Sequence, residues 1–289
     1  MNKIANPKSA SLLRILQFPL ARLFLVGGPL FVMMAVSNGF IQKFSSTPLA
    51  AIATAIAMAA FALVIYALLV RLIERRPVSE LSLSGMGREL GLGLLTGAAL
   101  YTVSVLILMA LGIYHIEGLN PWHFVLPAIA MTVTSGVFEE LVFRGALFRI
   151  IEEWLGSWIS LVVSSAVFGF SHLMNPAATV MSAIFISIEA GLLLAAAYML
   201  TRRLWLSIGL HMGWNYTQSA IFSGVVSGNA GDPGLIRPTI EGPVLLTGGT
   251  FGLEASLIAF IVCTAAGIAL LVMAVRRGNV VAPIWKRSH

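Results

Sequence analysis

Apolar runs of about twenty residues recur along this 289-residue chain, separated by short connectors that hold most of the charge. A helix needs roughly 20 apolar residues to cross the hydrocarbon core of a bilayer. Charged residues make up only 10% of the sequence, against about 25% in soluble domains. The sequence therefore predicts an all-α fold, a polytopic transmembrane helical bundle. We expect about eight spans, at residues 20–41, 49–71, 89–112, 121–147, 158–174, 176–200, 204–222 and 252–275.

The positions of the lysines and arginines predict how the bundle is oriented, because cytoplasmic loops carry an excess of them. With a cytoplasmic N-terminus, only Lys43 and Arg237 fall on the outer side. This asymmetry requires an even number of spans, so both termini are expected to be cytoplasmic. It also explains the formal net charge of +6, so we expect no nucleic-acid partner. We predict an integral multi-pass protein of the cell membrane, surrounded by the lipid bilayer.

Two adjacent carboxylates, Glu139 and Glu140, interrupt the predicted span 121–147. Charged groups at membrane depth are costly, so each needs a partner or a function. Glu140 precedes Arg144 by four residues, the favourable order for an ion pair on one helix face. Glu139 lies about 100° around the helix and has no basic residue three or four positions away. We expect Glu140 to pair with Arg144 and Glu139 to be available for chemistry.

Further polar residues occur in two later spans. Phe168 and His172 are four residues apart in one, and His211 and Asn215 are four apart in another, so each pair projects from one helix face. Glu139 and His172 are almost equally far from Gly156, where the chain is expected to turn. They should therefore lie nearly level in an antiparallel helical hairpin. We expect these groups to meet within the membrane.

The side chains named so far suit hydrolysis. Glu139 can act as a general base toward water, and a neighbouring histidine can share or relay the proton. The amide of Asn215, together with His211, can stabilise a developing oxyanion. Cys263 lies in a different span and no serine stands in a nucleophile-elbow pattern. Water is therefore the expected attacking group.

Three motifs resemble those of a known family. The residues Glu-Glu-Leu-Val-Phe-Arg at 139–144, Phe-Gly-Phe-Ser-His at 168–172 and His-Met-Gly-Trp-Asn at 211–215 occur in this order. Together they resemble the type II CAAX prenyl endopeptidases, the CPBP group of intramembrane proteases, whose motifs are Glu-Glu-x-x-x-Arg, Phe-x-x-x-His and His-x-x-x-Asn. The resemblance covers roughly residues 120–220. It divides the chain into an N-terminal region with three spans (1–119), a catalytic core (120–222) and an outer loop with the last span (223–289).

The resemblance implies a role for each motif residue. Glu139 and His172 would activate the water, while His211 and Asn215 would form the oxyanion site. Glu140, Arg144 and Phe168 would support the structure. The implied activity is that of an intramembrane endopeptidase acting on membrane-associated peptides or proteins, CAAX-like or other.

Members of this family are often labelled metalloproteases, although the glutamate-and-histidine mechanism needs no metal. The sequence contains no His-Glu-x-x-His motif. We therefore expect no cofactor. The alternative is a zinc ion held by Glu139, His172 and His211, with an open fourth position.

Other interpretations stay open at this level. Buried histidines commonly bridge helices, and Glu140 with Arg144 could form only an interfacial ion pair. A proton- or ion-coupled transporter would also use buried acids and histidines, but its repeated halves are not evident. A catalytically silent membrane scaffold on the same fold would keep the motifs without the activity. Glu189, an unpaired carboxylate in span 176–200, is a candidate for orienting one of the histidines.

Overall fold

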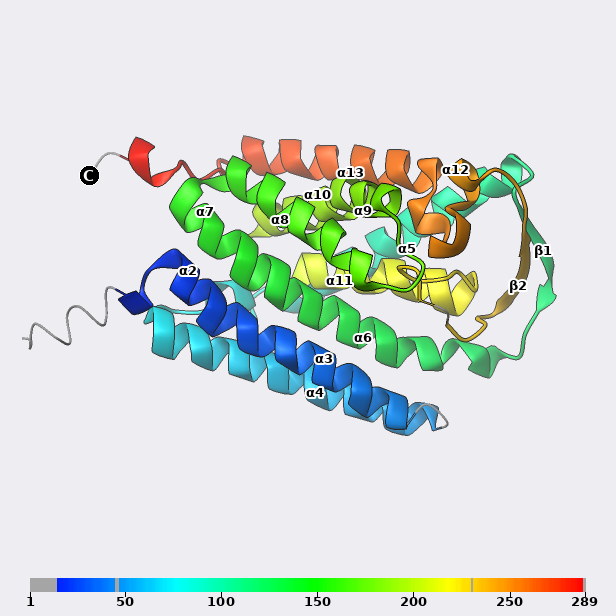
Figure 1. Cartoon of the computed structure of the whole chain (residues 1–289), viewed down its shortest axis with the longest axis horizontal. Helices are drawn as coiled ribbons and strands as arrows, with labels where there is room; N and C mark the ends of the chain where they lie inside the picture. Colours follow the sequence, from blue (N-terminus) through cyan, green and yellow to red (C-terminus); the bar gives the residue numbers. More distant parts are fainter. Residues whose placement is uncertain (1–14, 45–46, 230, 288–289) are drawn as a thin grey trace, which may run out of the picture.

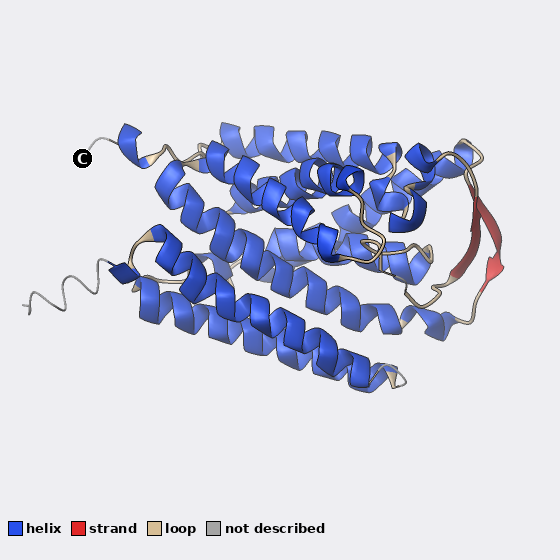
Figure 2. Ribbon diagram, viewed as in Figure 1, coloured by secondary structure: helices blue, strands red, loops and turns tan. Residues whose placement is uncertain are grey.

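The computed structural model describes residues 15–44, 47–229 and 231–287 as a bundle of long helices with a two-stranded ribbon at one end (Figure 1; Figure 2). Long helices result from leucine, alanine and methionine, which lose little freedom in a helix. In chain order the named helices are α2 (Pro19–Arg22), α3 (Gly28–Lys43), α4 (Pro48–Leu69), α5 (Met86–Ala110), α6 (Pro127–Glu140), α7 (Arg149–Leu155), α8 (Ser157–Ser171), α9 (Val180–Ile186), α10 (Leu192–Thr201), α11 (Trp205–Tyr216), α12 (Val244–Thr247) and α13 (Leu257–Arg276).

Within the described residues, seven helices are long and apolar enough to cross a membrane. The remaining predicted span, 204–222, is also helical, but shorter: α11 has 12 residues and continues into a five-residue π-helix, Thr217–Ile221. The bundle is therefore that of an integral multi-pass membrane protein. The seven candidates are Pro19–Ile41, Pro48–Glu74, Met86–Ala110, Trp122–Leu155, Ser157–Met174, Val180–Thr201 and Leu257–Arg276.

The described beginning of the first span and the end of the last span lie on the same side of the bundle. Figure 1 shows α2, α7 and the C-terminal end of α13 together at one end, opposite the ribbon. This arrangement is consistent with an even number of crossings, which stays a prediction. The predicted cytoplasmic position of residues 1–14 lies outside the described residues, and the assignment of this end to the cytoplasm stays a prediction.

The connection predicted as a loop at residues 223–251 contains a strand. Strand β2 (Ile236–Ile240) pairs antiparallel with β1 (Tyr114–Leu119), with Tyr114 opposite Ile240. The sequence did not predict this pairing because the two strands are far apart along the chain and no hairpin turn joins them. The ribbon ties the connection before α6 to the connection after α11.

Helix α5 packs with close backbone contact against α11, which carries His211 and Asn215. A Cβ atom at Gly97 would collide with the main chain of α11, and one at Gly213 would collide with the main chain of α5. Small residues let membrane helices approach in this way. The third span therefore fixes the position of a helix that carries two of the motif residues.

A network of ion pairs joins several helices at the end of the bundle where α7 lies. Arg149 Nη2 is 2.7 Å from Glu74 Oε1, and Arg76 Nη2 is 2.6 Å from Glu80 Oε1. The Tyr66 hydroxyl connects this network to the motif helix, because it lies 2.5 Å from Glu80 and 2.8 Å from the carbonyl oxygen of Gly145. We call this set the basic-end network; its charged members are Arg22, Glu74, Arg76, Glu80, Arg149 and Glu153.

Candidate active site

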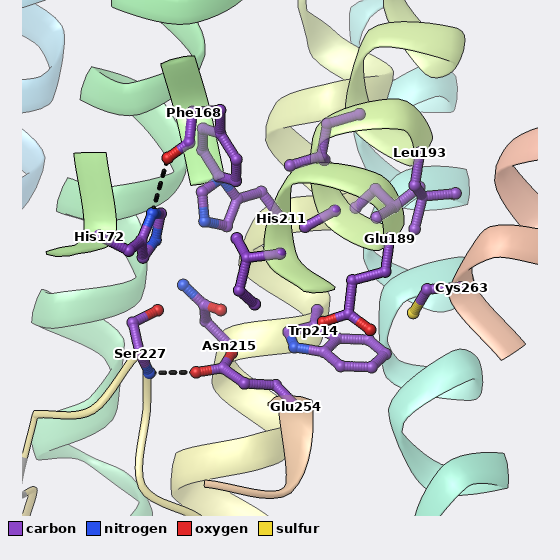
Figure 3. Close-up of a pocket in the computed structure, with 14 residues that line it drawn as sticks. Phe168, His172, Glu189, Leu193, His211, Trp214, Asn215, Ser227, Glu254 and Cys263 are labelled. Atoms are coloured by element: carbon purple, nitrogen blue, oxygen red, sulfur yellow. Dashed lines mark hydrogen bonds between the residues drawn. The ribbon is translucent and has the colours of Figure 1, made fainter. Parts of the chain in front are cut away.

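A cavity of about 40 Å³ lies between α8, α11, the segment around Glu189 and the start of the last span. His172, His211 and Asn215 all line it (Figure 3). One water molecule needs roughly 10–15 Å³ of such volume, so the cavity has room for a few waters. Three of the four residues predicted to be catalytic therefore share one cavity inside the bundle.

Glu140 contacts two side chains through one oxygen. Its Oε1 atom lies 2.8 Å from Nη1 of Arg144 and 3.0 Å from Nδ1 of His211. Glu140 and Arg144 are 0% and 1% exposed, and a buried ion pair of this kind needs further hydrogen bonds to offset its desolvation. The contact with His211 was not predicted. Glu140 thus supports both the helix that carries it and the orientation of the His211 ring.

Glu139 faces His211. Its Oε2 atom lies 3.9 Å from Nε2 of His211, and its side chain retains 21% of its exposure. Glu139 and His172 were expected to meet because they should lie at nearly the same level of an antiparallel hairpin. Among the described residues, however, no hydrogen bond or ion pair joins these two side chains. The same imidazole therefore has Glu140 at one nitrogen and Glu139 beyond the other.

The His172 ring is held by its own helix. Its Nδ1 atom lies 2.8 Å from the carbonyl oxygen of Phe168. A carbonyl oxygen can only accept, so Nδ1 carries the hydrogen and Nε2 of the neutral ring has a free lone pair. A hydrogen bond at one ring nitrogen commonly sets the role of the other in this way.

Phe168 packs among the charged and polar groups of the site. Its ring is edge-on to His172, with ring centroids 5.0 Å apart, and to His211 at 6.1 Å. The Arg144 guanidinium lies over it, 4.4 Å from the centroid. Phe168 thus separates the Arg144 charge from the cavity and restricts both imidazoles, while its carbonyl oxygen holds His172.

Asn215 is 5% exposed, and its Nδ2 donates to the hydroxyl of Ser135, 3.1 Å away. The amide has two N–H bonds, so one remains for another acceptor. Ser135 was missed in the sequence, although it precedes Glu139 by four residues and therefore projects from the same helix face. Its hydroxyl fixes the amide orientation.

Three of the helices at the site contain a π-helical segment, whereas α8, which carries Phe168, continues into a 3₁₀ turn at His172. Leu141–Phe148 follows the two glutamates, Ser187–Gly191 contains Glu189, and Thr217–Ile221 follows Asn215. Such segments are rare and occur frequently at functional sites. They change which side chains face the cavity without breaking the helix.

Several cavity residues were not predicted. Ser227 from the outer connection, Glu254 from the turn before α13, and Cys263 from α13 all line the cavity with Glu189. Glu254 was missed although it carried the signal that singled out Glu189, a lone carboxylate beside a long apolar run. Ser227 carried no such signal.

The residues do not fit a metal centre as they are arranged. In the part of the chain that the structure describes, no three His, Cys, Asp or Glu side chains are grouped as ligands of a metal ion. The three named for zinc are Glu139, His172 and His211, and Glu139 does not line the cavity that contains both histidines. No step below uses a metal.

Residues 121–217 match the family model of type II CAAX prenyl endopeptidase Rce1-like proteins. That segment is Rce1-like. All three motifs lie inside the match, and the family predicted from them is confirmed. The match supports a CAAX-type membrane protease at the level of the family. The comparisons with curated proteins and with solved structures gave no match.

Proposed function

We propose that this protein is an intramembrane endopeptidase that hydrolyses peptide bonds of membrane-associated substrates, CAAX-like or other, with water as the nucleophile. One observation supports the proposal above all. His172, His211 and Asn215 line a single cavity, and Glu139 lies 3.9 Å from His211. A proton carrier and hydrogen-bond donors thus surround one small volume that admits water, and the base lies next to His211.

Glu139 is the general base. Its carboxylate is partly exposed and takes a proton as the water oxygen attacks the carbonyl carbon of the scissile bond. Nε2 of His172 has a free lone pair in the neutral ring and can share this proton. The proton later passes to the leaving nitrogen when the carbon–nitrogen bond breaks, which leaves a carboxylic acid and an amine.

His211 and Asn215 stabilise the oxyanion that forms during attack. Asn215 keeps one amide N–H beyond its bond to Ser135. Nδ1 of His211 bonds Glu140. When the ring is protonated, Nε2 also carries a hydrogen, which it can donate to the oxyanion. The carboxylates of Glu140 and Glu139 lie on either side of this protonated ring. Donors that are already in place before the reaction stabilise charge without reorganisation.

Cleavage by the purified full-length protein tests the function. The protein is reconstituted in liposomes with membrane-anchored peptides, and new termini are identified by mass spectrometry. Glu139→Gln should lower turnover by about 10²- to 10⁴-fold, the usual contribution of a general base. Glu117→Gln, the same change at an exposed glutamate on β1, should leave turnover unchanged. Equal turnover in wild type and Glu139→Gln would refute this role for Glu139.

Removal of metal ions by a chelator distinguishes metal-free hydrolysis from zinc-dependent hydrolysis. Turnover that survives exhaustive chelation supports activation of water by Glu139 and His172 alone. Chelator-sensitive turnover, restored by zinc and accompanied by about one zinc per chain that is lost in His172→Ala, would replace this mechanism with a zinc mechanism. Turnover and bound metal are measured on the same preparations.

A further inference from the structure

Two carboxylates from different parts of the chain form one wall of the cavity. Glu189 belongs to the π-helical segment of the sixth span, and Glu254 to the 3₁₀ turn before α13. They are 1% and 4% exposed. Figure 3 shows them beside Trp214, away from His172 and Phe168. No lysine or arginine is among the residues that line the cavity.

The two carboxylates differ in how they are satisfied. Glu254 accepts a hydrogen bond from the backbone N–H of Ser227. Glu189 Oε2 is buried without a hydrogen-bond partner among the described residues, and so is Oε1 of Gln218. Both of these atoms are acceptors. At the cavity, Glu189 Oε2 is therefore an acceptor that no donor of the described residues satisfies.

A buried, unpaired carboxylate is costly unless a proton or a cation neutralises it. Two carboxylates that face one cavity increase the cost, because the charge of each opposes ionisation of the other. A primary ammonium supplies three donors and one positive charge. The indole of Trp214, which also lines the cavity, offers the ring face that attracts cations most strongly.

We infer that Glu189 and Glu254 form a subsite for a primary ammonium group, that of a lysine side chain next to the scissile bond of the substrate. The inference rests on the proposed function, because it makes this wall part of the substrate-binding surface. A cavity of about 40 Å³ suits a compact ammonium better than the larger, planar guanidinium of arginine. The subsite gives the enzyme a preference for lysine over apolar residues of similar length.

Binding tests the subsite without any cleavage. Full-length Glu139→Gln protein in a non-ionic detergent is titrated calorimetrically with N-acetyl-lysine methylamide and with its norleucine counterpart, which lacks the ammonium. The lysine compound should bind at least tenfold more tightly. Adding Glu189→Gln should remove most of this difference, whereas adding Glu117→Gln should not change it. Equal binding of the two compounds, or a lysine preference that persists in Glu189→Gln, would overturn the subsite.

Cleavage then separates failure of the subsite from failure of the function. Matched peptides with lysine or norleucine at each position around the cut are compared by kcat/KM, and the lysine to norleucine ratio should fall towards one in Glu189→Gln. If the lysine compound binds through Glu189 but no peptide is cleaved, the proposed protease fails and the subsite stands. If peptides are cleaved without lysine preference and the compound does not bind, the subsite alone is wrong.

Discussion

Glu80, in the basic-end network, and Glu254, in the cavity wall, are both almost fully buried, at 1% and 4% exposure, yet their surroundings shift their acidity in opposite directions. Burial raises the pKa of each. For Glu80, hydrogen bonds and charge from Arg76, with the charge of Arg149, outweigh burial and leave the pKa below its usual value. For Glu254 no cation opposes burial, and the pKa is raised to about 7.

The difference separates charges that hold the fold together from charges that are available to a ligand. In the basic-end network each carboxylate contacts at least one arginine, so its charge is compensated within the folded chain. In the cavity wall the compensating charge is missing, which is the state expected of a binding surface before its ligand arrives. Three substitutions and one titration test this difference.

The largest effect is expected from opening the basic-end network. Glu80→Ala leaves the guanidiniums of Arg76 and Arg149 with less compensation, and removing one partner of a buried pair costs about 3–5 kcal/mol. Thermal unfolding in detergent measures the loss, with Glu117→Ala as an exposed control that should stay within about 0.5 kcal/mol. A Glu80→Ala protein as stable as wild type would show that this network does not stabilise the fold.

The next effect concerns the oxyanion site. Asn215→Ala removes one donor, and one such donor contributes about 10²–10³ in kcat. KM should change much less, because the donor acts mainly in the transition state. Steady-state kinetics on reconstituted protein check this. A rise in KM with unchanged kcat would assign Asn215 to substrate binding instead.

A smaller effect is expected from the titration of Glu254. Because its folded pKa is raised, its protonated form contributes stability that is fully present below the unfolded pKa and is lost as pH rises through about 7. One pKa unit corresponds to about 1.4 kcal/mol, so the loss between pH 5 and pH 8 is on the order of 3 kcal/mol at most. The melting temperature should fall over this range.

Other groups near Glu254 make a matched variant necessary. Glu189, Tyr101 and Cys263 are close enough to interact electrostatically with it. The fall in melting temperature should therefore be compared in wild type and Glu254→Gln, and the variant should show the flatter profile. An equally steep profile in Glu254→Gln would assign the pH dependence to another group.

The smallest effect is expected from Glu189→Gln. The carboxylate has no ion-pair partner among the described residues, so its replacement by an amide of the same shape should change stability by less than about 1 kcal/mol, in either direction. Unfolding of this variant is measured beside Glu80→Ala. A loss as large as that of Glu80→Ala would mean that Glu189 is a structural acid and would end the distinction between the two regions.

The membrane bundle and the family resemblance of residues 121–217 were predictable because both depend on local sequence. A run of about twenty apolar residues is helical in a bilayer wherever it stands, and the three motifs can be recognised from spacing alone. The close pairing of β1 with β2 and the position of Ser227 at the cavity were not predictable. They depend on contacts between connections that are far apart along the chain.

The apolar runs and the motifs were enough to predict which helices form and which of them carry Glu139, His172, His211 and Asn215. The contact of Glu140 with His211 as well as Arg144, and the approach of Glu139 to His211, became evident only from the packed bundle. Helical spacing fixes the direction of a side chain about its own axis, but the rotation and depth of one helix against another follow from packing. The close contact of α5 with α11 at Gly97 and Gly213, and not the motifs, sets that packing.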